Sequence, residues 1–326
     1  MRVSIEPFDG RDPVAYRILR AAKQHESPDL PFMTEKAFKA GLLHPPPGAA
    51  FERYLGLLDG EPVGFGGLEL FQLDNLTNAH MVLDVLPEHR RHGVGRALYE
   101  FMLERAAANG RKHVIGSTVD THPDGAAFAR AMGAVAGLED TRSRLDLTKI
   151  DEGHLDKLRA EALAHAEGYR VIDWLGVPAR EIIDDVAYLE SRLLADAPTG
   201  DIAWEPEKID ADRLREDEEA RQKRGRISYC AGALHGDKLV AWTVIAGELA
   251  QPVQAWQQTT LVDPGHRGHR LGLLVKLANL DNIRHHRPGI EAIDTFNASQ
   301  NEHMLRINRA MGYRAVETST EWQHDL

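Results

Sequence analysis

The sequence changes character twice within the stretch Met81-Val-Leu-Asp-Val-Leu-Pro-Glu-His-Arg-Arg-His-Gly-Val-Gly-Arg-Ala-Leu98. It begins as an aliphatic strand, breaks at Pro87, becomes cationic and Gly-rich over residues 90–95, and continues as a helix. The first N–H groups of a helix have no intrahelical acceptor and carry the positive end of its dipole, so they attract anionic oxygen. Glycine lets a phosphate approach the backbone, and arginine adds charge-assisted hydrogen bonds. The stretch is therefore predicted to be a diphosphate-binding turn.

Two better-known phosphate-binding loops are excluded by the sequence. The nucleotide P-loop requires Gly-Lys-Ser or Gly-Lys-Thr after its glycines, and neither tripeptide occurs in the chain. The dinucleotide fingerprint Gly-x-Gly-x-x-Gly is absent as well, because Gly64-Phe-Gly-Gly67 has neither that spacing nor a helix after it. Neither nucleotide class accounts for the turn.

The turn resembles motif A of the GNAT superfamily of acyl-CoA-dependent N-acyltransferases, which reads Gln/Arg-x-x-Gly-x-Gly/Ala after a strand ending Val-x-Pro. Val85-Leu-Pro87 and Arg90-x-x-Gly93-x-Gly95 match that motif. The resemblance implies an α+β fold, in which a mixed, mostly antiparallel twisted sheet is flanked by helices and splayed at its fourth and fifth strands. It also implies that acyl-CoA lies in the splay, with its pyrophosphate on the turn and its pantetheine along the fourth strand.

The same stretch returns later as Leu261-Val-Asp-Pro-Gly-His-Arg-Gly-His-Arg-Leu-Gly-Leu273. Four residues of the first turn recur at one offset: Pro87, His89, Arg90 and Gly95 return as Pro264, His266, Arg267 and Gly272. Downstream, Arg130-Ala-Met-Gly133 recurs as Arg309-Ala-Met-Gly312. Landmarks repeated at nearly constant spacing indicate an internal duplication, so two tandem GNAT-like domains are predicted.

The length of 326 residues is enough for two cores of ordinary domain size. The predicted boundaries are 1–147 for an N-terminal domain, 148–167 for a connecting helix or linker, and 168–326 for a C-terminal domain. In this arrangement the strands within 134–147 close the first sheet and Tyr313–Gln323 closes the second.

Composition excludes several classes of protein. A net charge of −11 argues against tight attachment to nucleic acid or to an anionic membrane. No apolar run reaches membrane-spanning length, and the first residues read as a strand rather than a signal peptide. Cys230 is the single cysteine, so no internal disulfide is possible and a reducing cytoplasm is expected. No metal site is expected, because His285 and His286 lack a ligand framework around them.

By resemblance, both copies would bind acetyl-CoA, with main-chain groups of the central strand pairing with the pantetheine arm. The predicted cofactor-binding residues of the first copy are Leu83, Val85, Arg90, Arg91, His92, Gly93, Val94, Gly95 and Arg96. Those of the second copy are Leu261, Val262, Arg267, Gly268, His269, Arg270, Leu271, Gly272, Asn297 and Asn301. For Asn301 the alternative is capping of the last helix.

An attacking amine must lose a proton. An alkyl amine has a pKa near 10.4, so reaching its neutral form at pH 7 costs roughly 4–5 kcal/mol. Candidate bases are Glu69, on the strand before the central one, His80 and Asp84 on the central strand, and Glu248 in the second copy. Period-two alternation places His80 and Asp84 on the same side of their strand. For each candidate, a surface carboxylate or a hydrogen-bonded strand residue is the alternative interpretation.

The sequence departs from the family pattern in three places. The family tyrosine that protonates the leaving thiolate is expected four residues before the glycine of the final Met-Gly, but Ala129 and Asn308 occupy those positions. Water or another group must then protonate the thiolate, or one copy is inactive. Arg270 stands where the motif has its first glycine, so CoA binding is better supported in the first copy.

Trp242 and Trp256 are expected to fill the core, with an acceptor pocket as the alternative.

The leading hypothesis is an N-acetyltransferase that moves an acetyl group from acetyl-CoA to a primary amine of a small molecule by direct attack, as a monomeric pseudo-dimer or a homodimer. The two-copy layout is similar to that of mycothiol synthase, so transfer to a cysteinyl pseudodisaccharide is one possible reaction, and acylation of an antibiotic is equally open. The alternative is a CoA-binding regulatory or scaffold module in which one or both domains are catalytically silent. A third hypothesis makes the first copy purely structural.

Overall fold

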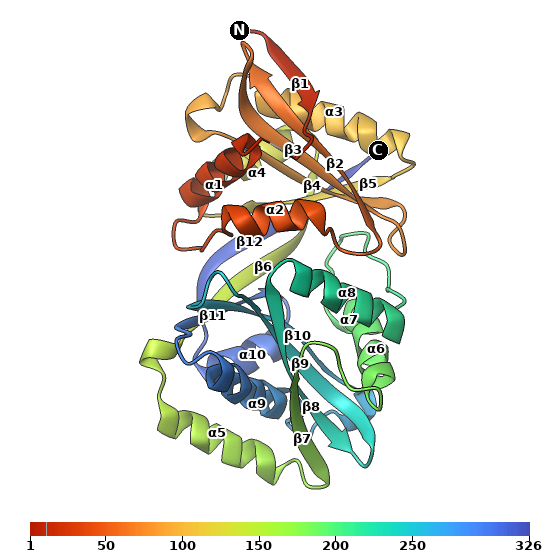
Figure 1. Ribbon diagram of the computed structural model, residues 1–326, viewed down its shortest axis with the longest axis vertical. Helices are drawn as coiled ribbons and strands as arrows, with labels where there is room; N and C mark the ends of the chain where they lie inside the picture. Colours follow the sequence, from red (N-terminus) through yellow and green to blue (C-terminus); the bar gives the residue numbers. More distant parts are fainter. Residues whose placement is uncertain (11) are drawn as a thin grey trace. The chain divides into compact units, whose positions relative to one another are not determined.

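The computed structural model describes residues 1–10 and 12–326 (Figure 1). These residues form two compact units. Unit 1 contains Met1–Asp140, Thr199–Glu205 and Glu317–Leu326, and unit 2 contains Thr141–Pro198 and Pro206–Val316. No helix within the described residues combines the length and apolar character needed to cross a bilayer. Both units are mixed α+β structures, as predicted.

Unit 1 is built on six hydrogen-bonded strands in the order β1-β2-β3-β4-β5-β12. Its strands are β1 (Val3–Pro7), β2 (Ala49–Leu58), β3 (Glu61–Phe71), β4 (Asn78–Val85), β5 (His113–Val119) and β12 (Arg314–Asp325). Its helices are α1 (Val14–Glu26), α2 (Glu35–Leu43), the 3-10 turn η1 (Pro87–His89), α3 (Val94–Ala108) and α4 (Pro123–Ala131). Strands β1 to β4 are antiparallel, whereas β4 and β5 are parallel.

Helix α3 packs closely on one face of this sheet. Its Leu98 and Met102 are fully buried against the glycines of β2 and β3. A Cβ atom at Gly56 would lie 2.8 Å from Leu98, and one at Gly66 would lie 2.8 Å from Met102, so a larger residue at either position would force these side chains of α3 to shift. Helices α1 and α2 cover the opposite face, where their apolar residues pack around Phe65. The sheet is thus buried on both faces at its centre.

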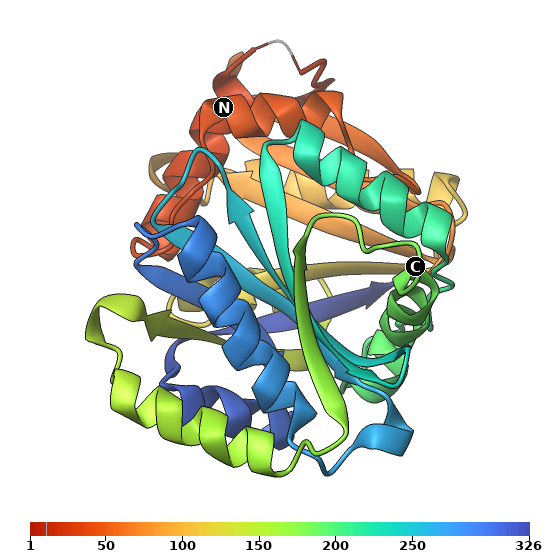
Figure 2. The ribbon, with the colours of Figure 1, turned by 60° about the horizontal axis from the view of Figure 1, so that its bottom comes forward.

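Unit 2 repeats this architecture with the strand order β6-β11-β10-β9-β8-β7. Its strands are β6 (Val135–Asp146), β7 (Tyr169–Leu175), β8 (Arg226–His235), β9 (Lys238–Glu248), β10 (Gln254–Val262) and β11 (Ala292–Ala298). Its helices are η2 (Leu147–Lys149), α5 (Glu152–Ala164), α6 (Ile183–Ser191), α7 (Leu193–Asp196), α8 (Ala211–Lys223), η3 (Pro264–His266), α9 (Leu271–His286) and α10 (Glu302–Met311). Figure 2 shows α9 lying along the strands of this sheet, where it is almost entirely buried.

The compact units are not the two contiguous halves expected from the sequence. Strand β12, the last of the chain, pairs antiparallel with β5 of unit 1, from Ser319 opposite Val119 to Asp325 opposite His113. Strand β6, expected to close the first sheet, runs from unit 1 into unit 2, where it neighbours β11. Asp294 of β11 fixes it there through ion pairs with Arg142 at 2.8 Å and Arg144 at 2.6 Å. The strand expected to close the second sheet therefore lies next to β5 in unit 1, and the strand expected to close the first sheet lies next to β11 in unit 2.

Both parallel strand pairs open after three residues. In unit 1 the pairing runs from Asn78 opposite His113 to His80 opposite Ile115, and the two strands continue without further pairing. In unit 2 β10 and β11 pair only from Gln254 opposite Ala292 to Trp256 opposite Asp294. This is the splay at the fourth and fifth strands that the resemblance implied.

Candidate functional site

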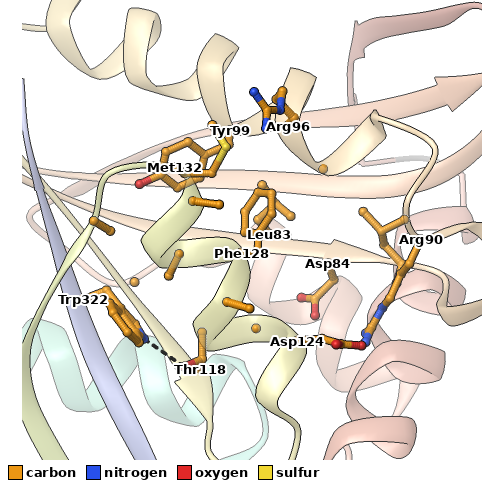
Figure 3. Close-up of a pocket in the computed structure, with 18 of the residues that line it drawn as sticks. Leu83, Asp84, Arg90, Arg96, Tyr99, Thr118, Asp124, Phe128, Met132 and Trp322 are labelled. Atoms are coloured by element: carbon orange, nitrogen blue, oxygen red, sulfur yellow. Dashed lines mark hydrogen bonds between the residues drawn. The ribbon is translucent and has the colours of Figure 1, made fainter.

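A cavity of about 500 Å³ lies in the splay of unit 1 (Figure 3). Strand β4 contributes Met81, Leu83, Asp84 and Val85, and β5 contributes the run 116–119. The remaining wall comes from the start of α3, from α4, from the C-terminal end of α1 and from Trp322 of β12. The cavity exists because β4 and β5 diverge past His80 and the side chains around the gap, among the residues described, do not fill it.

The turn before α3 presents its backbone to this cavity. Arg91 and Gly93 adopt left-handed φ values of 67° and 88°, which reverse the chain into the helix. The first helical hydrogen bond runs from Ala97 N to Gly93 O at 3.0 Å, so the N–H groups of residues 94–96 have no helical acceptor. Among the residues the structure describes, no side chain caps this helix. Gly93, Gly95 and Arg96 line the cavity, so an anion there would meet free N–H donors and the positive end of the helix dipole.

Gly95 forms the floor of this cradle. A Cβ atom at position 95 would lie 3.7 Å from both Phe128 and Val85 and 3.8 Å from Leu83. These are ordinary contact distances, so a side chain would fit the protein but would occupy space inside the cavity. The glycine therefore keeps the cavity open next to the helix terminus.

The arginines of the turn divide into two groups. Arg90 also lines the cavity, but its guanidinium is bound within the protein: its Nε donates to Val85 O at 3.3 Å and its Nη2 pairs with Glu26 at 2.9 Å. Arg91 and Arg96 line the cavity, and neither forms an ion pair with any carboxylate in the described chain. Arg90, predicted to contact phosphate, thus holds the turn against α1 and the end of β4. Arg91 and Arg96 are the cations placed to meet an anion.

We expect Arg96→Gln to weaken the binding of coenzyme A to the protein by about tenfold, the loss of one charge-assisted hydrogen bond at an exposed position. Calorimetric titration at two salt concentrations measures this, and the salt dependence of the affinity should also fall. Arg17→Gln, an exposed arginine of α1 outside the cavity wall, is the control. Equal affinities for both variants would contradict the assignment of Arg96.

Asp84 is the one predicted base that lines the cavity. It is 3% exposed, and its Oδ1 lies 3.3 Å from Lys23 Nζ of α1. Its Oδ2 is buried without a hydrogen-bond partner in the part of the chain described. Burial raises the pKa of the Asp84 carboxyl, and the Lys23 ammonium opposes that shift. A carboxylate with a raised pKa and a free oxygen is suited to accept a proton.

The other candidate bases lie elsewhere. His80 and Asp84 do share a strand face, but His80 does not line the cavity, and burial lowers the pKa of its imidazole. Glu69 stands directly opposite His80 in the sheet. Glu248, at the end of β9, pairs with Arg226 across the β8–β9 hairpin at 2.8 Å. These side chains are held by their own strands rather than gathered at the cavity.

Residues from the end of the chain complete the cavity wall. Ala129 lies in the wall, as its place in the motif requires, but offers no acidic proton. The space beside it is filled by Trp322, which packs on Ala129 and Ala134 and donates from Nε1 to Thr118 Oγ1 at 2.8 Å. Sequence reasoning missed Trp322, because nothing local to it indicates which sheet β12 joins. Lys23 and Tyr99 also line the cavity and were missed, because no sequence motif marks their positions on α1 and α3.

The turn before α9 has the same backbone conformation as the turn before α3, but glycine and arginine have exchanged places in it. Gly268 and Arg270 have φ values of 88° and 53°, at the two positions that Arg91 and Gly93 occupy in the first turn. Arg270 therefore does not reshape the turn. It adopts the left-handed conformation itself, which a residue with a Cβ rarely does.

The predicted binding groups of the second copy are occupied by internal contacts. Arg267 pairs with Asp196 at 2.9 Å, Arg270 pairs with Glu161 of α5 at 2.7 Å, and His269 Nδ1 lies 3.3 Å from His165 O. Leu261 and Leu271 are buried in the core, Val262 packs against it, and a Cβ at Gly272 would lie 3.6 Å from Ile307. Asn301 caps α10 by accepting from Met304 N, and Asn297 accepts from Asn308.

Two further exchanges separate the copies. Arg96 is the third residue of α3, and the third residue of α9 is Leu273, which is buried. Tyr99 is the sixth residue of α3, and the sixth residue of α9 is Lys276. Trp242 packs in the core of unit 2, stacked on Trp174, and Trp256 stacks on Phe296. The anion-binding features are therefore concentrated in unit 1.

A parallel strand pair that opens at an uncapped, glycine-bearing helix start, present twice, defines a tandem acyltransferase-type fold. The family model described as Acetyltransferase (GNAT) family matches residues 14–134. Those residues match the GNAT acetyltransferase family, and the whole chain has the fold of a tandem GNAT protein.

Solved structures agree over the full length of the chain. A tandem GNAT protein from the clavulanic acid biosynthesis pathway is 27% identical, with a TM-score of 0.81 over 99% of this chain and 98% of that chain. A GCN5-related N-acetyltransferase from Sphaerobacter thermophilus is 13% identical, with a TM-score of 0.68 over 99% and 95% of the two chains. A glucosamine N-acetyltransferase region of a fungal multi-domain β-N-acetylglucosaminidase is 12% identical, with a TM-score of 0.72 over 99% of this chain and 38% of that chain. The last two likenesses show the fold alone. No curated protein matched the sequence.

Proposed function

We propose that the protein is an N-acetyltransferase that moves an acetyl group from acetyl-CoA to a primary amine of a small molecule, and that unit 1 holds the donor. The observation that carries the proposal is the cavity of about 500 Å³ in the splay of unit 1, with an uncapped helix start and with Arg91 and Arg96, unpaired among the residues described, in its wall. This combination suits a long ligand with a diphosphate near one end.

The residues of unit 1 fit such a donor. The N–H groups of residues 94–96, with Arg91 and Arg96, would hold its diphosphate. The edge of β4 beyond His80, which β5 leaves unpaired, would hold an extended arm by main-chain hydrogen bonds. The bound thioester supplies an activated acyl group. Leu83, Val85 and Phe128 give the cavity an apolar wall that excludes water from the reacting atoms.

Transfer of the acyl group forms a bond between the amine nitrogen and the acyl carbon and breaks the bond from that carbon to sulfur. The nitrogen loses a proton, and the sulfur leaves with the electron pair. Asp84 is the cavity carboxylate available to receive that proton, because its Oδ2 has no hydrogen-bond partner within the described residues. Placing a base near the amine offsets part of the cost of deprotonating it at neutral pH.

The similar tandem GNAT protein is described as part of the clavulanic acid biosynthesis pathway, which is small-molecule chemistry. That description supports a small-molecule acceptor for this chain. The acceptor would be a primary amine, because the cavity offers the Asp84 carboxylate to receive the proton that an attacking amine loses.

Two measurements test the proposal. Calorimetric titration with CoA and acetyl-CoA should give binding at micromolar to millimolar concentration, and free thiol should be released from acetyl-CoA above background with at least one member of a panel of primary amines. Tight CoA binding with no thiol release for any amine would favour a CoA-binding regulatory or scaffold module, which Ala129 and Asn308 in place of tyrosine also suit. Absence of CoA binding would overturn both functions.

A further inference from the structure

The cavity of unit 1 contains a phenol that the predicted site did not include. Tyr99 projects from the sixth position of α3, is 8% exposed and lines the cavity. Its Oη lies 3.2 Å from Nδ1 of His324, on strand β12. Its ring packs edge-on against Phe128, which also lines the cavity, with ring centroids 5.7 Å apart. The packing and the hydrogen bond together fix the direction of the hydroxyl.

Tyr99 belongs to the closed end of the cavity. His324 stands opposite Val114 in the sheet, and Val114 is paired with Ala79 in the segment where β4 and β5 are still joined. In Figure 3, Tyr99 and Met132 lie on the side of the cavity away from Arg90, and the ring of Tyr99 extends away from Arg96, which precedes it by one helical turn. A donor whose diphosphate rests on the turn and whose arm follows β4 would therefore bring its sulfur toward Tyr99.

We propose that Tyr99, hydrogen-bonded to His324, donates the proton that the departing sulfur takes up in the transfer reaction. The inference rests on the proposed function. As the bond from carbon to sulfur breaks, the sulfur keeps the electron pair and receives the phenolic proton. The phenolate then regains a proton from solvent, while the hydrogen bond to His324 holds the Tyr99 oxygen in place. The proton lost by the amine leaves separately, so protons and electrons balance.

The other hydroxyl groups in the wall are less suited to this role. Thr118 Oγ1 accepts from Trp322 Nε1 at 2.8 Å, and Ser117 is exposed to solvent. Ala129, at the position where the family places a tyrosine, has no proton to give. Burial raises the pKa of Tyr99 to about 12, so its phenol stays protonated across the neutral range. A thiol ionises near pH 8.5, below the phenol, so the transfer to sulfur is completed when solvent reprotonates the phenolate.

The binding test uses CoA and desulfo-CoA, which differ only at the sulfur. Above about pH 9 the free thiol is mostly ionised, and a phenol that faces it would stabilise the thiolate by a charge-assisted hydrogen bond. We expect the wild-type protein to prefer CoA over desulfo-CoA by about fivefold more at about pH 9.5 than at pH 7, and Tyr99→Phe to lose this difference. Tyr54→Phe removes another buried phenolic hydroxyl of unit 1, bonded to Glu52 outside the cavity, and should keep the difference.

The kinetic test separates a catalytic group from a structural one. Tyr99→Phe should lower kcat by about 100-fold and change the KM for acetyl-CoA by less than about threefold. His324→Gln should reduce kcat less, because it disturbs the position of the Tyr99 hydroxyl but leaves the phenolic proton in place. Thermal unfolding of each variant shows whether the fold is kept.

Wild-type kcat together with a wild-type preference for CoA in Tyr99→Phe would overturn the assignment and leave the proposed function standing. Failure of the wild-type protein to bind either ligand would instead overturn the proposed function.

Discussion

Gly95→Val is expected to weaken the binding of coenzyme A by at least about 100-fold, equivalent to about 2.7 kcal/mol. The valine Cβ would sit at ordinary contact distance from Phe128, Val85 and Leu83, and its two methyl groups would extend into the cavity beside the helix start. Gly95 does not have a positive φ, so the substitution strains neither the turn nor the helix. The loss of affinity should therefore occur without loss of stability. Calorimetry for affinity and thermal unfolding for stability measure the two effects.

The duplication supplies a matched control. Gly272 occupies the same position in α9, and a Cβ there would lie 3.6 Å from Ile307, 3.7 Å from Val262 and 3.9 Å from Thr260. The two substitutions therefore introduce similar crowding in the two copies. If unit 1 holds the donor, Gly272→Val leaves the affinity for CoA within about twofold of wild type, the scale of an effect outside the binding site. Loss of binding in Gly272→Val with binding retained in Gly95→Val would assign the donor to unit 2.

The second large effect is expected on stability, at Lys276. This lysine is 1% exposed in the core of unit 2, with its Nζ 5.3 Å from the ring centroid of Tyr313. It forms no ion pair with any residue the structure describes. Burial lowers the pKa of its ammonium from 10.5 to about 7. We expect Lys276→Met to increase the free energy of unfolding at pH 7 by about 3–4 kcal/mol, because methionine fills similar space without a charge to desolvate.

The pH dependence follows from the same shift. Between about pH 7 and pH 10 the unfolded chain binds more protons at Lys276 than the folded chain, so this residue makes the wild-type free energy of unfolding rise with pH. Below about pH 7 the ammonium is protonated in both states and the penalty is constant. The advantage of Lys276→Met should therefore be largest at pH 7 and below, and should shrink toward pH 10.

Denaturant unfolding of Lys276→Met at several pH values measures this trend. Lys223→Met replaces an exposed lysine of the same unit and should show no such change with pH. An equal stability difference between wild type and Lys276→Met at pH 7 and pH 9.5 would contradict a displaced pKa at Lys276.

Local features of the site were predictable from the sequence. The break at Pro87, the glycines at 93 and 95 and the helix that follows are decided by neighbouring residues, because glycine and proline act on the backbone conformation of their own segment. The splay also followed, through the resemblance that the turn carries. The common face of His80 and Asp84 was predicted for the same reason, since alternation along a strand is a local property.

The roles of single side chains were less predictable. Arg90 matches the motif, yet Glu26 of α1 binds its guanidinium. Arg270 keeps the backbone conformation of the first turn, and Glu161 of α5 pairs with its guanidinium. In both turns the partner lies on a helix distant in the chain, so a motif identifies the backbone shape while the neighbouring helix decides what each charge contacts.

The sequence by itself determined two copies, each with a strand, a glycine-bearing turn and a helix, because these depend on backbone preferences within a few residues. Only the tertiary structure decided that β12 completes unit 1 while β6 enters unit 2, and so brought Trp322 to the cavity wall and His324 to the hydroxyl of Tyr99. The physical reason is that strand pairing is a non-local choice. Strands β6 and β12 have similar alternation of apolar and polar residues, so the sequence pattern fits either strand to either sheet edge. The packing of each whole unit selects between them.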